Sequence, residues 1–241
     1  MDLLPAIDIR GGRCVRLVQG DYERETVFDD DPAEAARRWW KAGASRLHVA
    51  DLDGAREGRP VNTEAVERIV GAVDIPVQLG GGLRSLESVR RHLGAGVERA
   101  VIGTAAVENE PLLRELLARF PGRIVGGVDA RDGVVVTEGW TDVSGIAAPQ
   151  FVRGLAEAGV PRIVYTDTLR DGTLTAPNYA AIEDILALGL DLKVIYAGGI
   201  SSVEQLRRLA TTGVEAAIIG RALYTGDIDL EQALAEMAKI A

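Results

Sequence analysis

The sequence VQLGGGLRSLESVRRHLGAGVERAVIGTAAV at positions 77–107 recurs in altered form as VIYAGGISSVEQLRRLATTGVEAAIIGRALY at positions 194–224. Identical residues include the pairs Gly81/Gly198, Gly82/Gly199 and Gly103/Gly220, which are 117 positions apart. A weaker echo, offset by 121 positions, places residues 5–8 over residues 126–129. Both offsets are close to half of the 241-residue chain, so the repeat predicts that each half contributes the same set of elements.

Apolar runs of strand length alternate with helical patterns along the whole chain. We predict strands near 2–9, 46–51, 76–80, 99–103, 124–129, 162–167, 193–197 and 216–220. Helices are expected at about 32–43, 62–72, 85–95, 109–120, 148–158, 178–188, 202–212 and 229–239. Eight βα units fit either a closed barrel or an open doubly wound sheet. The repeat favours a single (β/α)8 TIM-barrel domain over 1–241, built from two homologous half-barrels of about 1–120 and 121–241.

Composition excludes several classes of function. The formal net charge of −9 argues against general binding to nucleic acid or to an anionic membrane. The only cysteine, Cys14, cannot form an internal disulfide, which favours a reducing compartment. The start of the chain lacks a signal-peptide pattern, and no apolar run approaches the ~18 residues that span a bilayer. We therefore expect a soluble, cytoplasmic protein, and we expect it to be a monomer.

Two carboxylates close symmetric strands of this barrel. Asp8 ends the first predicted strand and Asp129 the fifth, so both would point into the mouth where such barrels place their chemistry. Taken singly, a carboxylate at a strand end more often caps a helix or pairs with an arginine. The symmetric pair instead favours general acid–base catalysis, provided that the surroundings separate the two pKa values.

Glycine-rich turns provide a second signal. Turns of this kind let backbone N–H groups approach an anion, and they commonly bind phosphate after strands 7 and 8 of such barrels. A tight βα turn is the ordinary alternative, but here the pattern occurs twice at one offset. The sequence therefore predicts two phosphate sites and a small bis-phosphorylated ligand. The predicted phosphate-binding residues are Gly81, Gly82, Gly103 and Thr104 at one site, and Gly172, Gly199, Gly220 and Arg221 at the other.

These residues, together with several further motifs, resemble the phosphoribosyl isomerase (ProFAR isomerase) family of histidine biosynthesis. The resemblance covers the whole chain. Its motifs include Leu4-Pro-Ala-Ile-Asp-Ile9, residues 16–20 (RLVQG), 47–52 (LHVADL), 80–84 (GGGLR), 139–140 (GW), 171–174 (DGTL), 197–201 (AGGIS) and 219–221 (IGR). The related cyclase of the same pathway shares the repeat and both aspartates, but the Pro-Ala-Ile-Asp start and the Gly-Trp pair favour the isomerase.

The resemblance implies an Amadori rearrangement of a ribosyl aminoaldose to a ribulosyl aminoketose, with no cofactor and no metal. Asp129 would be the general acid in ring opening, and Asp8 the base that removes the C2 proton. Mobile loops are expected to close over the ligand, with Trp140 stacked on its imidazole. His48 could be either a ligand contact or a structural residue of its strand. The expected substrate-binding residues are Arg16, Gln19, His48, Trp140, Thr166 and Asp171.

Two other functions remain open. Relatives that also rearrange phosphoribosyl anthranilate tend to have an arginine two residues before the loop tryptophan, where this chain has Glu138, although Arg131 or Arg16 could replace it. A non-catalytic phosphosugar-binding barrel would need neither carboxylate. Two smaller expectations concern residues outside the site: His92 should lie at a helix surface, and the acidic residues 29–31 should cap the helix that starts at Pro32 rather than bind a metal.

Overall fold

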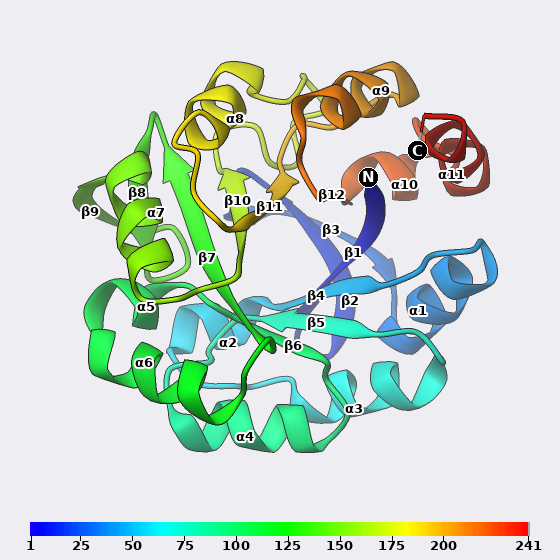
Figure 1. The fold of residues 1–241 in the computed structure, drawn as a ribbon. Helices are drawn as coiled ribbons and strands as arrows, with labels where there is room; N and C mark the ends of the chain where they lie inside the picture. The colour runs from blue at the N-terminus through cyan, green and yellow to red at the C-terminus, as the bar shows by residue number, and fades with distance from the viewer. Residues whose placement is uncertain (241) are drawn as a thin grey trace.

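The computed structural model describes residues 1–240 and has a ring of parallel strands surrounded by helices (Figure 1). Each strand pairs with the next, and β12 returns to pair with β1 from Asp2↔Ala216 to Pro5↔Ile219, which closes the ring. The predicted (β/α)8 barrel is therefore confirmed. The eight ring strands are β1 (Asp2–Arg10), β4 (Leu47–Asp51), β5 (Val77–Gly80), β6 (Arg99–Ile102), β7 (Ile124–Arg131), β10 (Arg162–Asp167), β11 (Lys193–Ala197) and β12 (Ala216–Ile219).

Helices of eight to ten residues cover the outside of the ring, close to where the apolar periodicity predicts them (Figure 1). Their N-caps follow the usual chemistry: Asp31 accepts a hydrogen bond from the backbone N–H of Ala33, and Ser85 accepts one from that of Ser88. The expected capping role of the acidic cluster at 29–31 is thus confirmed for Asp31. The helices are α1 (Pro32–Lys41), α3 (Thr63–Ala72), α4 (Leu86–Gly94), α6 (Glu110–Arg119), α7 (Ala148–Glu157), α8 (Tyr179–Leu186), α9 (Val203–Thr212) and α11 (Leu230–Ala238).

Seven further elements were not predicted. Three are helices of five or six residues: α2 (Leu52–Glu57), α5 (Thr104–Glu108) and α10 (Arg221–Thr225). Four are antiparallel strands that extend the sheet after β1 and after β7: β2 (Arg13–Val18), β3 (Asp21–Asp29), β8 (Val134–Thr137) and β9 (Asp142–Ala147). Helices of this length show too few turns for periodicity, and β3 is polar and largely exposed. These elements bring loop residues over the barrel mouth.

The core has two layers. Small and branched side chains fill the inside of the ring, namely Leu4, Ala6, Val125, Val164, Ile195, Ala197, Ala216 and Ile218. A larger cluster lies between the strands and the helices and includes Ile7, Leu47, Leu79, Leu116 and Tyr196. Strands buried on both faces require continuous apolar runs, which explains why the sequence shows no alternation there.

Polar interactions recur at equivalent places in the two halves. At the carboxyl ends of β4 and β10, Asp51 accepts a hydrogen bond from the side-chain amide of Asn62, and Asp167 accepts one from that of Asn178. Opposite charges also pair near the start of these strands, Arg46 with Glu98 and Arg162 with Glu215. These pairs fit the period of the sequence repeat. Superposition of 1–120 on 121–241 as half-barrels stays a prediction.

The structure overturns the expectation for His92. This residue is only 1% exposed, and its Nδ1 donates to the carbonyl of Ser88 at 2.8 Å. Its ring lies toward α3, where Thr63 Oγ1 is 3.5 Å from Nε2, so His92 helps to join α3 to α4. The helical pattern identified the element but not which face packs on its neighbour. Within residues 1–240, no helix has both the length and the apolar character needed to cross a membrane.

Replacing Asp51 with alanine should lower the free energy of unfolding by about 3 kcal/mol. The carboxylate is 3% exposed and accepts from the backbone N–H groups of Gly54, Val61 and Asn62 at 2.8–2.9 Å. These three backbone donors would lose their acceptor, and each buried unsatisfied donor costs roughly 1–3 kcal/mol, whereas the side-chain amide of Asn62 keeps Asp53 as a second acceptor. Denaturant titration measures the loss. Asp30→Ala, at an exposed position, should stay within about 0.5 kcal/mol of the parent; equal losses in both variants would contradict this assignment.

Candidate active site

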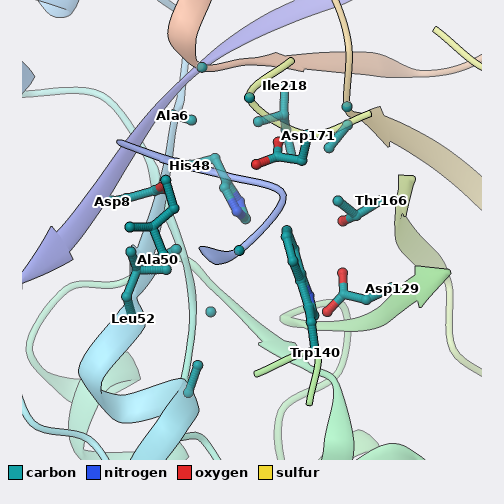
Figure 2. Close-up of a pocket in the computed structure, with 18 of the residues that line it drawn as sticks. Ala6, Asp8, His48, Ala50, Leu52, Asp129, Trp140, Thr166, Asp171 and Ile218 are labelled. Atoms are coloured by element: carbon teal, nitrogen blue, oxygen red, sulfur yellow. The ribbon is translucent and has the colours of Figure 1, made fainter. Parts of the chain in front are cut away.

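A single cavity lies at the carboxyl ends of the ring strands, where (β/α)8 barrels place reacting groups. Both predicted catalytic carboxylates line it, Asp8 from β1 and Asp129 from β7. Figure 2 shows them on opposite sides, with His48 and Trp140 between. Of the expected substrate-binding residues, Arg16, His48, Trp140, Thr166 and Asp171 also line the wall. Gln19 does not. Its side chain donates instead to the carbonyl of Leu169 at 2.6 Å, which ties the first loop to the sixth.

Asp8 is held in a buried ion pair. Its Oδ2 lies 2.8 Å from Nη1 of Arg16, and Nη2 of the same guanidinium lies 3.6 Å from Asp171. Burial raises the pKa of Asp8 to about 6, while Arg16 opposes and Asp171 adds to this rise. Burial likewise raises the pKa of Asp171, and Arg16 again opposes it. A carboxyl group with a pKa near 6 is well matched to proton transfer around neutral pH.

Asp129 has a different environment. Burial raises the pKa of this carboxyl group, the hydrogen bonds from Trp140 and Thr166 lower it, and the charge of Asp171 raises it further. No cation is among the causes of its shift, in contrast to Asp8 and its guanidinium partner. The cavity therefore surrounds the two carboxylates with different partners, ionic at Asp8 and neutral hydrogen-bond donors at Asp129. Different surroundings are what an acid–base pair needs.

His48 lies on β4, with its ring between the carboxylates (Figure 2). Its Nδ1 is 3.0 Å from the side-chain amide nitrogen of Gln78 on β5. Burial, and secondarily the charge of Arg16, lowers the pKa of His48 to about 4. The imidazole is thus neutral near pH 7 and is available as a hydrogen-bond donor or acceptor rather than as a cation.

The loop that carries Trp140 has a strained backbone and is held in place by two arginine side chains. Glu138, Gly139 and Trp140 all have positive φ angles of 54°, 65° and 74°, a conformation that costs energy for residues other than glycine. Arg84 pairs with the Glu138 carboxylate, and Arg131 donates to the carbonyl of Trp140 at 3.1 Å. On the opposite side of the mouth, Gly20 approaches the Trp140 ring so closely that a Cβ there would lie 2.5 Å from it. The first and fifth loops are therefore in contact over the cavity.

The glycine turns lie at the ends of the cavity. Gly81 and Gly103 line one end, and Gly172, Gly199, Gly220 and Arg221 line the other. Gly82 and Thr104 are outside the wall; Thr104 Oγ1 accepts from the backbone N–H of Glu138 at 3.1 Å. Gly220 has an additional contact, because the Arg16 guanidinium lies where its side chain would be, only 2.2 Å from an ideal Cβ. The absence of a side chain at Gly220 is what lets Arg16 reach Asp8.

Several wall residues were not predicted. Tyr22 comes from β3, donates to the carbonyl of Leu52 at 2.9 Å and lies between the guanidinium groups of Arg10 and Arg56. Asp51 also lines the cavity, but its carboxylate oxygens already accept hydrogen bonds from the backbone N–H groups of Gly54 and Val61 in the following loop. The polar Gln78 within the apolar run VQLG does not line the cavity, but it was a usable signal for a buried polar contact behind the wall, to His48. Residues 1–240 contain no group of three His, Cys, Asp or Glu side chains able to hold a metal ion.

Comparison with known proteins agrees with this geometry. A closed barrel with two carboxylates in unlike surroundings facing one cavity defines the class of (β/α)8-barrel enzymes that use acid–base chemistry. The family profile "Histidine biosynthesis protein" matches residues 2–229, and the chain belongs to this family.

Three relatives match nearly full length. A protein of a Roseiflexus species is 53% identical over 235 residues, which is 98% of this chain and 99% of the relative. A Picosynechococcus protein is 51% identical over 97% of this chain and 92% of its own. A Dehalococcoides mccartyi protein is 48% identical over 99% and 100%. All three are named 1-(5-phosphoribosyl)-5-((5-phosphoribosylamino)methylideneamino) imidazole-4-carboxamide isomerase.

The Asp8 carboxyl group should titrate with a midpoint near pH 6 in the unliganded protein. Arg16→Met removes the neighbouring cation that favours the ionised form, so the midpoint should move to higher pH. Arg16→Lys keeps a cation and should move it less. Carboxyl ¹³C chemical shifts followed against pH measure all three. A midpoint near 4 in the parent, or a lower one in Arg16→Met, would show that burial does not control this group.

Proposed function

We propose that the chain catalyses the Amadori rearrangement of the aminoaldose ProFAR to its ribulosyl aminoketose in histidine biosynthesis. The observation that carries the proposal is the pair of carboxylates, Asp8 buried and Asp129 half-buried, that face each other across one cavity. The names of the relatives support it, since they specify an isomerase whose substrate has two phosphoribosyl groups. A cytoplasmic location and a monomeric state are part of the proposal. Cys14 is buried and free, in keeping with a reducing compartment.

The chemistry requires two groups that transfer protons. Asp129, in its protonated form, donates to the ring oxygen of the aminoaldose, the ring C–O bond breaks, and a protonated Schiff base forms at C1. Asp8, in its ionised form, then removes the proton from C2, and the electron pair of that C–H bond forms the enolamine. Return of this proton from Asp8 to C1, with loss of the C2 hydroxyl proton to the ionised Asp129, yields the aminoketose and restores both carboxyl groups. The raised pKa of each carboxyl group is compatible with these roles, and Arg16 keeps a fraction of Asp8 ionised near neutral pH.

The two ends of the cavity suit a ligand with a phosphate at each end. Gly81 and Gly103 lie at one end, and Gly172, Gly199 and Gly220 at the other, where Arg221 adds a cation. Side chains do not cap the backbone N–H groups that follow Gly103 and Gly220. Local donors of this kind are how a chain with a net charge of −9 can hold a polyanion. We propose that each end binds one phosphate and that Trp140 stacks on the imidazole.

The rival functions have less support. Glu138 places a negative charge in the tryptophan loop and occupies Arg84, while Arg16 and Arg131 are engaged with Asp8 and Trp140. An anthranilate carboxylate bound near Trp140 would thus lie close to an acidic side chain, and the guanidinium groups of Arg16, Arg84 and Arg131 already have partners. A non-catalytic barrel gains nothing from burying Asp8 and Asp129, because burial of ionisable groups costs free energy.

Replacing Asp8 or Asp129 with asparagine should each lower kcat by at least ~10²-fold and change ligand affinity much less. The phosphates supply most of the binding, whereas each carboxylate acts only in proton transfer. A steady-state assay with ProFAR measures kcat, and product titration measures affinity. Substrate with deuterium at C2 should show a primary isotope effect in the parent. Near-normal turnover in either variant would assign that residue a structural role.

Glu138→Arg should raise kcat/KM for phosphoribosyl anthranilate by at least ~10-fold relative to that for ProFAR. The change replaces a repulsive charge by an attractive one, and like charges placed against each other cost several kcal/mol, where 1.4 kcal/mol is a factor of ten. Glu138→Gln, which only removes the charge, should fall between. Side-by-side assays with both substrates decide the matter; a parent enzyme already active on both would refute the assignment of Glu138 to specificity.

A further inference from the structure

Gln78 is a fully buried polar residue behind the cavity. It is 0% exposed and does not line the wall. The strand register places it between His48 on β4 and Arg99 on β6, inside the ring. Its Oε1 meets no donor within residues 1–240, a situation that costs roughly 1–3 kcal/mol for a buried acceptor. An apolar side chain would avoid this cost, so the amide needs an explanation.

The contact of Gln78 with His48 has a defined direction. The amide nitrogen of Gln78, 3.0 Å from His48 Nδ1, has hydrogen atoms and no lone pair to offer, so it donates and Nδ1 accepts. A neutral imidazole with an accepting Nδ1 carries its hydrogen on Nε2. Because the pKa of His48 is lowered to about 4, the neutral ring is the form present near pH 7.

The other ring nitrogen is left for a ligand. His48 lines the cavity, and its ring extends into the space between the carboxylates (Figure 2). In the part of the chain that the structure describes, Nε2 of His48 has no hydrogen-bond partner, and it is not buried. It is therefore accessible from the cavity, next to where a substrate would lie between Asp8 and Asp129.

We propose that Gln78 is a positioning residue that holds His48 as the Nε2–H tautomer, so that His48 donates one hydrogen bond to an oxygen atom of the bound sugar phosphate. The identity of that ligand rests on the proposed function; the tautomer does not. Gln78 acts only through His48, because it does not reach the cavity itself. The buried amide thereby controls which nitrogen of the histidine faces the substrate.

The tautomer can be measured without catalysis. The chain has only two histidines, His48 and His92, so ¹⁵N-labelled protein gives two imidazole spin systems, assigned with a His92→Gln variant. In the unliganded parent at pH 7, His48 should show a protonated Nε2 and a bare Nδ1. Gln78→Glu offers an acceptor in place of the donor and should move the proton to Nδ1. A parent with the proton on Nδ1 would overturn the proposal.

Kinetics test whether Gln78 acts through His48. Gln78→Met, of similar size and without a donor, should lower kcat/KM for ProFAR by ~3–10-fold, the range expected for one hydrogen bond, with most of the change in KM. In a His48→Ala background, the same substitution should change kcat/KM less than about twofold. Equal losses in both backgrounds would mean that Gln78 only supports the barrel, and the proposal would be wrong. An Nε2–H tautomer in a protein inactive on ProFAR would instead count against the proposed function.

Discussion

The pairing of β12 with β1 is the interaction on which the site depends. Four consecutive residue pairs, from Asp2↔Ala216 to Pro5↔Ile219, join the last ring strand to the first. With the ring closed, every ring strand points its carboxyl end to the same mouth, and β1 and β7 are four strands apart in a ring of eight. Asp8 and Asp129, distant in sequence, can face each other only under this condition. In an open sheet of the same strands, they would lie along an edge.

Burial in that mouth sets the electrostatics. Desolvation is the largest cause of the raised pKa values of Asp8, Asp129 and Asp171, and the charge of Asp171 raises the pKa of the other two further. Arg16 is the guanidinium that interacts with two of them. Its access depends on the missing side chain of Gly220, so the residue directly after β12 influences the protonation of a carboxyl group on β1.

The strands, the long helices and the positions of the two cavity carboxylates could be predicted because each follows from local pattern and symmetry. The eight apolar runs predict eight strands, and the repeat favours their closure into a ring. Asp8 and Asp129 lie near the carboxyl ends of two of these strands, which places both at the mouth of the barrel. The short helices escaped prediction because they have too few turns to show a period, and in the two antiparallel extensions the outer strands β3 and β9 are largely exposed and lack an apolar run. The Arg84–Glu138 and Gln78–His48 contacts join strands or loops 54 and 30 residues apart, and spacing alone gives no sign of them.

The glycine pairs can be explained in two ways, by the close crossing of neighbouring loops and by the binding of an anion. A Cβ on Gly81 would lie 2.2 Å from the carbonyl oxygen of Asp51, and one on Gly198 would lie 2.7 Å from that of Asp167. Both positions also have φ angles near 100° that other residues rarely adopt. Close crossing of neighbouring loops therefore requires these glycines whether or not an anion binds. The repeat of Gly81 as Gly198, 117 positions later, is therefore evidence first for equivalent loop crossings in the two halves. Phosphate binding is supported by a further fact: Gly81, Gly198 and Gly199 line the same cavity as the two carboxylates.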